Sequence, residues 1–327
     1  MDNKDFIEVK DLVVEYSSGG HTVHAVNGVS FSLKKGENLA LVGETGAGKT
    51  SIAKAILRIL PDPQGKIVGG SILFDGEDLI QLNSRDMRKV RGKRISMVFQ
   101  DPMTALNPVK TVGYQIAEVI RKHDLLSKRE ALEKAKEMLE VVGIPGARHS
   151  EYPHQFSGGM KQRVVIAMAL ANKPDLLLAD EPTSALDVTI QAQVLELMSN
   201  LKKEFGTSII LITHDLGIVA RECDKVAVIY AGEVVEYAGK YELFTTPSHP
   251  YTIGLFGAIP DLHSDAKRLI NIEGLPPDPA DLPEGCCFHP RCPRATAECR
   301  ETKPELTEIG PNHFCRCFHA GPKEGRS

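Results

Sequence analysis

The stretch "GETGAGKT" at residues 43–50 constrains the fold of this 327-residue chain more than any other feature. Gly43 and Gly48 are separated by four residues, and a lysine and a threonine follow directly. A glycine-rich loop with this spacing is typical of the turn between a buried strand and a helix. The apolar run "NLALVG" (38–43) precedes the loop, and a segment expected to be helical, "KTSIAKAILRIL" (49–60), follows it. We therefore expect a strand, loop and helix unit at this point of the chain.

Two more apolar runs, "DLLLAD" (175–180) and "SIILIT" (208–213), end at polar residues. Continuous apolar runs of this length are typical of strands that are covered on both faces. Two helices are expected from apolar residues at helical spacing, one over 128–143 and one over 188–205, the latter with Asp187 as its N-cap. Strands that alternate with helices predict an α/β fold with a mainly parallel sheet.

The amino-terminal segments "FIEVKDLVVEYS" and "HAVNGVSFSLKKG" alternate more between apolar and polar residues, which predicts an antiparallel β region. The composition changes near residue 260. Six of the 7 cysteines and half of the 20 prolines lie at or after Pro260. We therefore expect a main domain over 1–260 and a loop-rich extension over 261–327, called the tail below.

The overall charge and hydropathy exclude some classes of protein. Lys and Arg number 39 against 43 Asp and Glu, so no broad positive charge attracts nucleic acid or anionic lipid. The start, "MDNKDFIEVK", lacks the apolar stretch of a signal peptide, and apolar runs such as "VVIAMALA" are shorter than the roughly 20 residues of a spanning helix. We expect a cytoplasmic protein that touches a membrane only through a partner.

The loop at 43–50 has the residue types that bind the phosphates of a nucleotide. Glycines let several backbone N–H groups face one anion, and the amino terminus of the following helix adds a positive dipole. Lys49 can bridge the β- and γ-phosphates, and Thr50 can hold Mg²⁺ through its hydroxyl group. ATP or GTP is the implied ligand; the alternative, an ordinary glycine turn with an incidental lysine, does not account for the flanking strand and helix.

Two acidic residues end the strand expected at 175–180. Asp180 can bind the Mg²⁺ shell, and the adjacent Glu181 can orient or deprotonate the attacking water if the chain turns there. Alternatively, Glu181 merely ends the strand. His214, in "LITHD", ends the next strand, where a γ-phosphate sensor would lie. Taken alone, it is better explained as an ordinary histidine with satisfied hydrogen bonds, and only the neighbouring motifs favour the sensor.

A second glycine-rich stretch, "FSGGMKQR" (156–163), raises the question of why one chain needs two such loops. Taken alone, it predicts a flexible turn. In company with the other motifs, the chain resembles the ATPase subunits of ABC transporters. "GETGAGKT" resembles their Walker A loop, "FSGGMKQR" their signature motif, and "LLLADEP" their Walker B strand with its glutamate. Gln100 in "FQDPM" resembles the Q-loop glutamine, "SALD" (184–187) the D-loop, and His214 the switch histidine.

This resemblance implies a P-loop NTPase core with a helical subdomain at about 101–165, and it implies roles for individual residues. Catalytic roles fall to Gln100, Glu181 and His214, and Mg²⁺ would be held by Thr50, Gln100 and Asp180. Tyr16 resembles the residue that stacks on adenine, although it could equally pack a strand pair. The implied nucleotide contacts are Tyr16, Gly43, Thr45, Gly46, Ala47, Gly48, Lys49, Thr50, Ser51, Ser157, Gly158, Gly159 and Asp187.

The resemblance also answers the question of the second loop. In this family two subunits pair head to tail, and the signature residues of one chain close over the ATP that the other holds. ATP then favours the closed dimer, and hydrolysis removes this preference. Phe156 stands where leucine is commoner in the family. This difference does not touch the phosphate contacts.

Longer matches, "YPHQFSGGMKQR" (152–163) and "PSHPYTIGLFGAIP" (247–260), resemble the dipeptide and oligopeptide importer branch. The implied partners are two membrane permease subunits, a homologous ATPase subunit or a second copy, and an external peptide-binding protein. The implied location is the cytoplasmic face of the membrane. Nickel and other solute importers share much of this pattern. A soluble ABC-type ATPase acting on nucleic acid is the other alternative, although neither a second ATPase unit nor a coiled-coil insertion is seen.

The cysteines of the tail are candidate metal ligands. Four thiolates satisfy either a tetrahedral zinc site or a [4Fe–4S] cluster, and the lack of a CxxC pair counts against common zinc sites. The resemblance implies an iron–sulfur cluster on Cys286, Cys292, Cys299 and Cys317. Zinc and unmetallated thiols or disulfides stay open as alternatives, as does the part played by the spare Cys287 and Cys315. A structural role for the cluster is favoured over electron transfer.

Overall fold

The computed structural model describes residues 5–184, 186–257 and 272–321. The chain folds into two compact units. The first unit combines residues 1–80 with 212–327, and the second consists of residues 81–211. The boundary expected near residue 260 lies outside the described residues.

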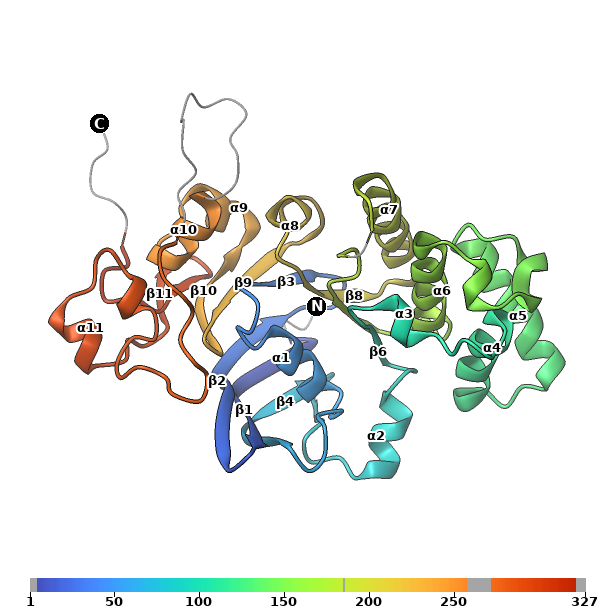
Figure 1. Ribbon diagram of the computed structural model, residues 1–327, viewed down its shortest axis with the longest axis horizontal. Coiled ribbons are helices and arrows are strands. Elements are labelled where there is room, and N and C mark those ends of the chain that lie inside the picture. Colours follow the sequence, from blue (N-terminus) through green and yellow to red (C-terminus); the bar gives the residue numbers. More distant parts are fainter. Residues whose placement is uncertain (1–4, 185, 258–271, 322–327) are drawn as a thin grey trace. The chain divides into compact units, whose positions relative to one another are not determined.

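An antiparallel sheet forms the amino-terminal part of the first unit (Figure 1). Its strands are β1 (Ile7–Ser18), β2 (His21–Leu33), β4 (Gly65–Phe74) and β5 (Glu77–Asp78), in the order β2-β1-β4-β5. β1 pairs antiparallel with both β2 and β4. The antiparallel region predicted from the alternating sequence is confirmed.

The first unit also contains a run of strands in the order β11-β12-β10-β9-β3. β3 (Asn38–Val42) and β9 (Lys225–Tyr230) are parallel, and every residue of β3 is buried. β10 (Glu233–Gly239) pairs antiparallel with β9 and with β12 (His313–Cys315), which in turn pairs with β11 (Thr307–Gly310). The tail therefore adds two strands to this sheet.

Helices complete the first unit. Within the described part of residues 1–80, the helix is α1 (Lys49–Ile56). The others are α8 (Leu216–Glu222), α9 (Lys240–Thr245), α10 (Pro250–Gly257), the 3₁₀ turn η3 (His289–Arg291) and α11 (Ala297–Glu301).

The second unit places helices around a small parallel sheet. β6 (Ile95–Val98) pairs parallel with β7 (Leu176–Asp180), and β8 (Ser208–Ile212) follows β7 in the strand order. All residues of these strands are buried. The helices are α2 (Ser84–Val90), α3 (Pro102–Ala105), α4 (Val112–His123), α5 (Lys128–Val141), α6 (Gly158–Leu170) and α7 (Val188–Phe205), with 3₁₀ turns η1 (Gly146–Ser150) and η2 (Pro153–Gln155).

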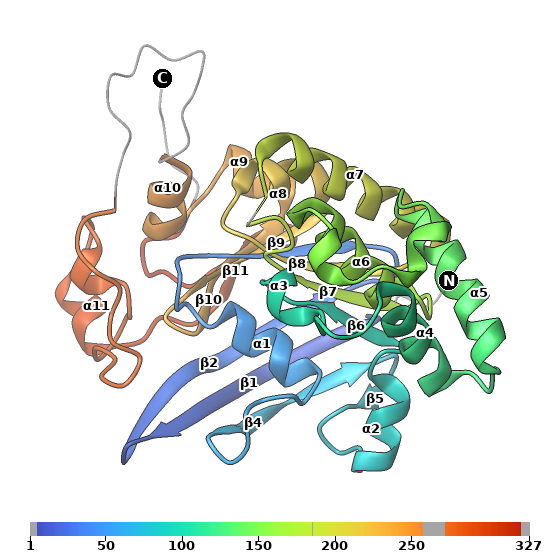
Figure 2. The same cartoon turned by 45° about the vertical axis from the view of Figure 1, so that its right-hand side comes forward.

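The cluster of α4, α5 and α6 shows how the sequence fixes these helices (Figure 2). Ser127 accepts a hydrogen bond from the Glu130 N–H, and the Glu130 side chain accepts one from the Ser127 N–H, so α5 begins with a capping box. α5 and α7 confirm the two helices predicted from apolar spacing.

Among the described residues, no helix combines the length and apolarity needed to span a membrane.

Candidate nucleotide-binding site

The loop at 43–50 connects β3 to α1, as the sequence predicted. Gly43 has φ +152°, and a Cβ there would collide with the Ile229 carbonyl oxygen. Gly48 has φ +100°, and a Cβ there would collide with the Ala25 carbonyl oxygen. Both positions require glycine because the backbone passes directly against neighbouring backbone in a conformation that other residues rarely adopt.

The side chain of Lys49 lies against this loop. Its Nζ donates hydrogen bonds to the carbonyl oxygens of Gly43 at 2.7 Å and Glu44 at 2.8 Å, and the residue is buried. An ammonium group held across a loop of this kind is suited to a polyphosphate. Tyr16, half-buried on β1, donates from its hydroxyl group to Ser51 Oγ at 3.1 Å. The structure therefore brings Tyr16 to the first turn of α1.

The second unit brings two of the predicted catalytic residues together. Gln100 Nε2 donates to Glu181 Oε2 at 3.0 Å. Asp180, the last residue of β7, is 3% exposed, and Glu181 follows it with φ +45°. The chain therefore turns at the end of β7. Such a turn is needed if Asp180 is to serve Mg²⁺ while Glu181 serves the attacking water. A left-handed conformation at a residue that is not glycine costs about 1 kcal/mol and is common at functional sites.

The signature stretch begins α6. Ser157 is the N-cap, and its Oγ accepts a hydrogen bond from the Met160 N–H at 3.4 Å. Asp187 caps α7 in the same way and accepts from the Ile190 N–H at 3.0 Å. His214 follows β8 and belongs to the first unit, as does the loop at 43–50.

One buried residue of the signature helix α6 was not identified from the sequence. Gln162 is fully buried, and its Nε2 donates to the Pro182 carbonyl oxygen at 2.5 Å. This bond ties α6 to the segment that follows Glu181. A glutamine two residues before the apolar run "VVIAMALA" was the available signal, because an amide buried in such surroundings needs a partner.

The four tail cysteines predicted as ligands line one small pocket, together with His249, His289 and His319. Backbone N–H groups donate to Cys292 Sγ and to Cys317 Sγ, each at 3.4 Å. Burial raises the pKa of Cys286 to about 11. The spare cysteines are placed elsewhere: Cys287 Sγ donates to Glu233 at 3.8 Å, and Cys315 is buried in β12.

The described residues contain no group of three or more His, Cys, Asp or Glu side chains arranged to hold one metal ion. A tetrahedral zinc site would need sulfur atoms only about 3.8 Å apart. An iron–sulfur cube holds one thiolate at each of four corners and so keeps them farther apart. Four thiols in one pocket are the donor set that such a cluster uses, but their positions among the described residues do not form a metal site.

The loop at 43–50, the buried strands and the signature helix α6 are the parts of a P-loop nucleotide-binding cassette. Residues 26–184 match the family model "ABC transporter", and residues 235–299 match "Oligopeptide/dipeptide transporter, C-terminal region". A solved dimeric structure of the ATP-binding cassette MJ0796 bound to ADP and Pi superimposes with a TM-score of 0.65 at 27% identity, covering 72% of this chain and 98% of that one. The cbiO1 structure from Clostridium perfringens gives a TM-score of 0.63 at 31% identity, covering 75% and 92%.

Curated relatives extend the likeness over almost the whole chain. The oligopeptide transport ATP-binding protein OppD of Bacillus subtilis is 50% identical, covering 97% of this chain and 89% of that protein. OppD of Escherichia coli is 49% identical, covering 95% and 92%, and the dipeptide transport protein DppD of B. subtilis is 49% identical, covering 95% and 94%. The chain belongs to the ABC transporter family, as one of its ATP-binding proteins.

Proposed function

We propose that this chain is the ATP-hydrolysing subunit that powers import of dipeptides or oligopeptides through a membrane permease. The observation that carries the proposal is the likeness to the oligopeptide and dipeptide transport proteins, which includes the tail as well as the cassette. A cassette alone is shared by transporters of many solutes. The tail match is therefore what favours peptide over nickel or another small solute.

ATP would lie on the loop at 43–50, with Tyr16 beside the adenine. Thr50, Asp180 and Gln100 would hold Mg²⁺, which neutralises charge on the phosphate oxygens. Glu181 would orient and deprotonate the attacking water, and His214 would contact the γ-phosphate. The bond between Gln100 and Glu181 supports this arrangement, because it places the amide beside the general base.

The signature residues Ser157, Gly158 and Gly159 would complete the ATP site of a second subunit. An N-cap and the first turn of a helix present N–H groups that attract anions. The γ-phosphate would thus join two subunits, either two copies of this chain or this chain and a homologue. The dimeric ADP and Pi complex of a cassette with 27% identity supports such pairing.

Cys286, Cys292, Cys299 and Cys317 would hold a [4Fe–4S] cluster in the tail. Bound there, the cluster would supply a rigid cross-link among loops that a hydrophobic core alone would hold weakly. The pocket that these four cysteines share supports a common role for them, and the choice of cluster over zinc rests on the resemblance of their spacing. The permeases, reached at the cytoplasmic face of the membrane, would bind near Gln100, and an external protein would deliver the peptide.

The test is reconstitution of the chain with its permease subunits and peptide-binding protein in proteoliposomes. Dipeptides or oligopeptides in the lumen that holds the binding protein are expected to stimulate ATP hydrolysis several-fold. Nickel ions and free amino acids serve as comparison solutes. Stimulation by nickel alone would contradict the cargo, and stimulation of the isolated chain by nucleic acid would contradict the transport function.

A further inference from the structure

One charge in the phosphate loop opposes the ligand that the loop is built to bind. Glu44 lies directly after Gly43, within a loop suited to a polyphosphate. Its carboxylate is 30% exposed, so solvent screens it only partly. An unpaired carboxylate there would repel the phosphates and lower the affinity for ATP.

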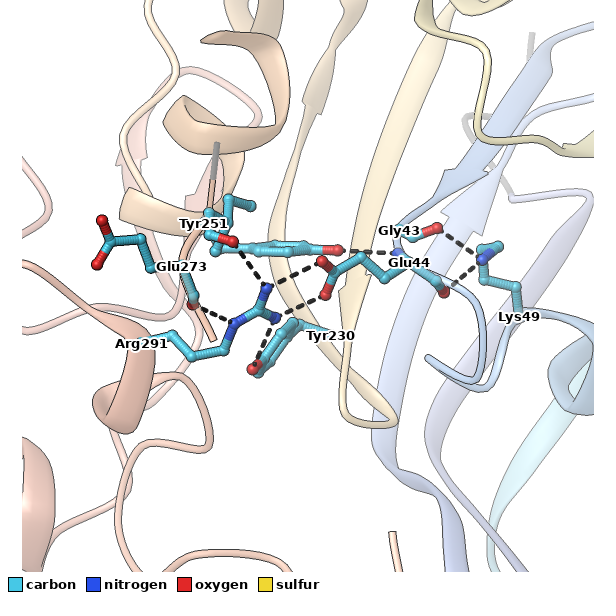
Figure 3. Close-up of polar contacts among 8 residues, drawn as sticks. Gly43, Glu44, Lys49, Tyr230, Tyr251, Glu273 and Arg291 are labelled. Atoms are coloured by element: carbon cyan, nitrogen blue, oxygen red, sulfur yellow. Dashed lines mark hydrogen bonds and ion pairs between the residues drawn. The ribbon is translucent and has the colours of Figure 1, made fainter. Parts of the chain in front are cut away.

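The tail supplies the opposite charge. Arg291, in η3, donates from Nη1 to Glu44 Oε2 at 2.7 Å and from Nη2 to Glu44 Oε1 at 3.0 Å. Figure 3 shows the guanidinium group facing the carboxylate of Glu44. The Arg291 side chain is 4% exposed. A bidentate ion pair of this kind is among the stronger interactions between side chains, and its geometry fixes both partners.

The backbone of Glu44 is held as well as its side chain. The Glu44 N–H donates to the Tyr251 hydroxyl group at 2.9 Å, and the Glu44 carbonyl accepts from Lys49 Nζ. Tyr251 is fully buried. With Arg291 on the carboxylate, the residue after Gly43 is fixed on three sides, and one of these contacts is the lysine expected to bind phosphate.

Arg291 is itself anchored by the tail and by β9. Its Nε donates to the Glu273 carbonyl oxygen at 3.0 Å, and its Nη1 to the Tyr230 hydroxyl group at 3.3 Å (Figure 3). Phe288, three residues earlier, packs against Tyr230 with ring centroids 5.2 Å apart and against Tyr251 at 5.5 Å. The guanidinium is therefore placed by the tail and by the tyrosines of β9 and α10 against which the tail packs, in addition to its contact with the loop.

We infer that Arg291 is a positioning residue of the ATP site, a cation that the tail supplies to neutralise Glu44 and to fix the phosphate loop. The inference rests on the proposed role of the loop at 43–50, but on neither the cargo nor the metal in the tail. It assigns the tail a part in nucleotide binding: the affinity for ATP depends on a residue about 250 positions away in the chain.

The test compares the KM for MgATP, the kcat and the melting temperature of the full chain and its variants. Arg291→Ala is expected to raise the KM about tenfold with kcat changed less than about twofold, because an unpaired Glu44 repels the phosphates. Adding Glu44→Gln to Arg291→Ala is expected to recover at least about threefold of this loss, since the repelling charge is gone. A residue that only docks the tail would show no such recovery.

Lys303→Ala is the matched control. Lys303 is another tail cation, and its carboxylate partner, Glu233, is not a residue of the loop at 43–50. Its loss is expected to leave the KM unchanged. Arg291→Lys keeps the charge without the two-point geometry and is expected to raise the KM about threefold; it replaces Arg291→Ala if that variant does not fold.

An unchanged KM in the Arg291 variant that folds overturns the inference, and so does a failure of Glu44→Gln to restore affinity. Lys49→Ala separates this failure from failure of the proposed function. If Lys49→Ala binds ATP normally, the loop is not the ATP site. If Lys49→Ala loses ATP while Arg291→Ala keeps it, only the inference is wrong.

Discussion

Gly158 and Gly159 are adjacent and look equivalent in the sequence, yet the structure separates their roles. A Cβ at Gly159 would lie 2.6 Å from the side chain of Ile190 on α7. A Cβ at Gly158 would meet nothing within 4 Å among the described residues. Gly159 is thus required by packing inside the chain, whereas no described residue fills the space beside Gly158.

This difference predicts opposite outcomes for two single substitutions. Gly158→Ala is expected to change the free energy of unfolding by less than about 0.5 kcal/mol, because the site is open and alanine favours helix. Its ATPase activity is nevertheless expected to fall more than about tenfold, since the added methyl group would lie against the partner's nucleotide. Chemical denaturation and steady-state ATPase assays measure the two quantities.

Gly159→Ala serves as the comparison and is expected to destabilise the chain by about 1–3 kcal/mol through overpacking. Full ATPase activity in a stable Gly158→Ala variant would show that no phosphate approaches this face of α6.

A site residue could be predicted from the sequence when it lies in a short motif, but not when its role depends on a partner far away in the chain. Lys49, Thr50 and Asp180 lie in short motifs whose spacing carries the chemistry, and the strand and helix around each motif were predicted with them. The pairing of Glu44 with Arg291 is different. The two residues are 247 positions apart, and the sequence around each of them gives no indication that the other is its partner. Only the folding of the tail onto β9 and β10 brings them together.

At the scale of elements, the buried strands and capped helices followed from the sequence because local physics decides them. β3, β7 and β8 are fully buried, which continuous apolar runs indicate. Asp187 caps α7, as predicted from its place before the helix. The short strand β12 was not predicted, because its three residues carry no periodicity and its pairing with β10 is a long-range contact.

The cysteine pocket depends on several short elements of the tail at once. Cys299 lies in α11, Cys292 directly follows η3, and Cys317 lies just after β12. Anaerobically purified chain is expected to contain about four iron atoms and to absorb broadly near about 400 nm. Cys299→Ser is expected to lose the iron and lower the melting temperature. Metal analysis and absorbance spectra check this.

Cys287→Ser is the matched control and is expected to keep its iron, since Cys287 Sγ bonds to Glu233 and does not line the pocket. Colourless protein with about one zinc per chain would contradict the cluster. Iron lost equally from both variants would contradict the choice of ligands.

At the scale of the whole molecule, the two glycine-rich stretches belong to different units. The loop at 43–50 is part of the first unit and the signature helix α6 part of the second. The resemblance of the motifs predicted that the second stretch serves a neighbour, and the solved dimer of a similar cassette is consistent with pairing. A single sequence does not reveal whether the neighbour is a copy or a homologue, because both would present the same signature.

In the mechanism proposed here, ATP joins two subunits through the signature stretch of one and the loop at 43–50 of the other. Sedimentation velocity of Glu181→Gln tests it most directly, because this variant is expected to bind ATP without hydrolysing it. The variant is measured alone and mixed with the homologous ATPase subunit of its transporter, so that either kind of dimer is detected. ADP and a second substitution, Ser157→Arg, are the comparisons.

MgATP is expected to shift the variant from its 35.7 kDa monomer to a species of about twice that mass. ADP is expected to leave it monomeric, and Ser157→Arg is expected to abolish the shift while ATP still binds. If the variant stays monomeric with ATP bound, and the wild-type chain hydrolyses ATP at full rate at the lowest measurable concentration, ATP does not act by joining two subunits.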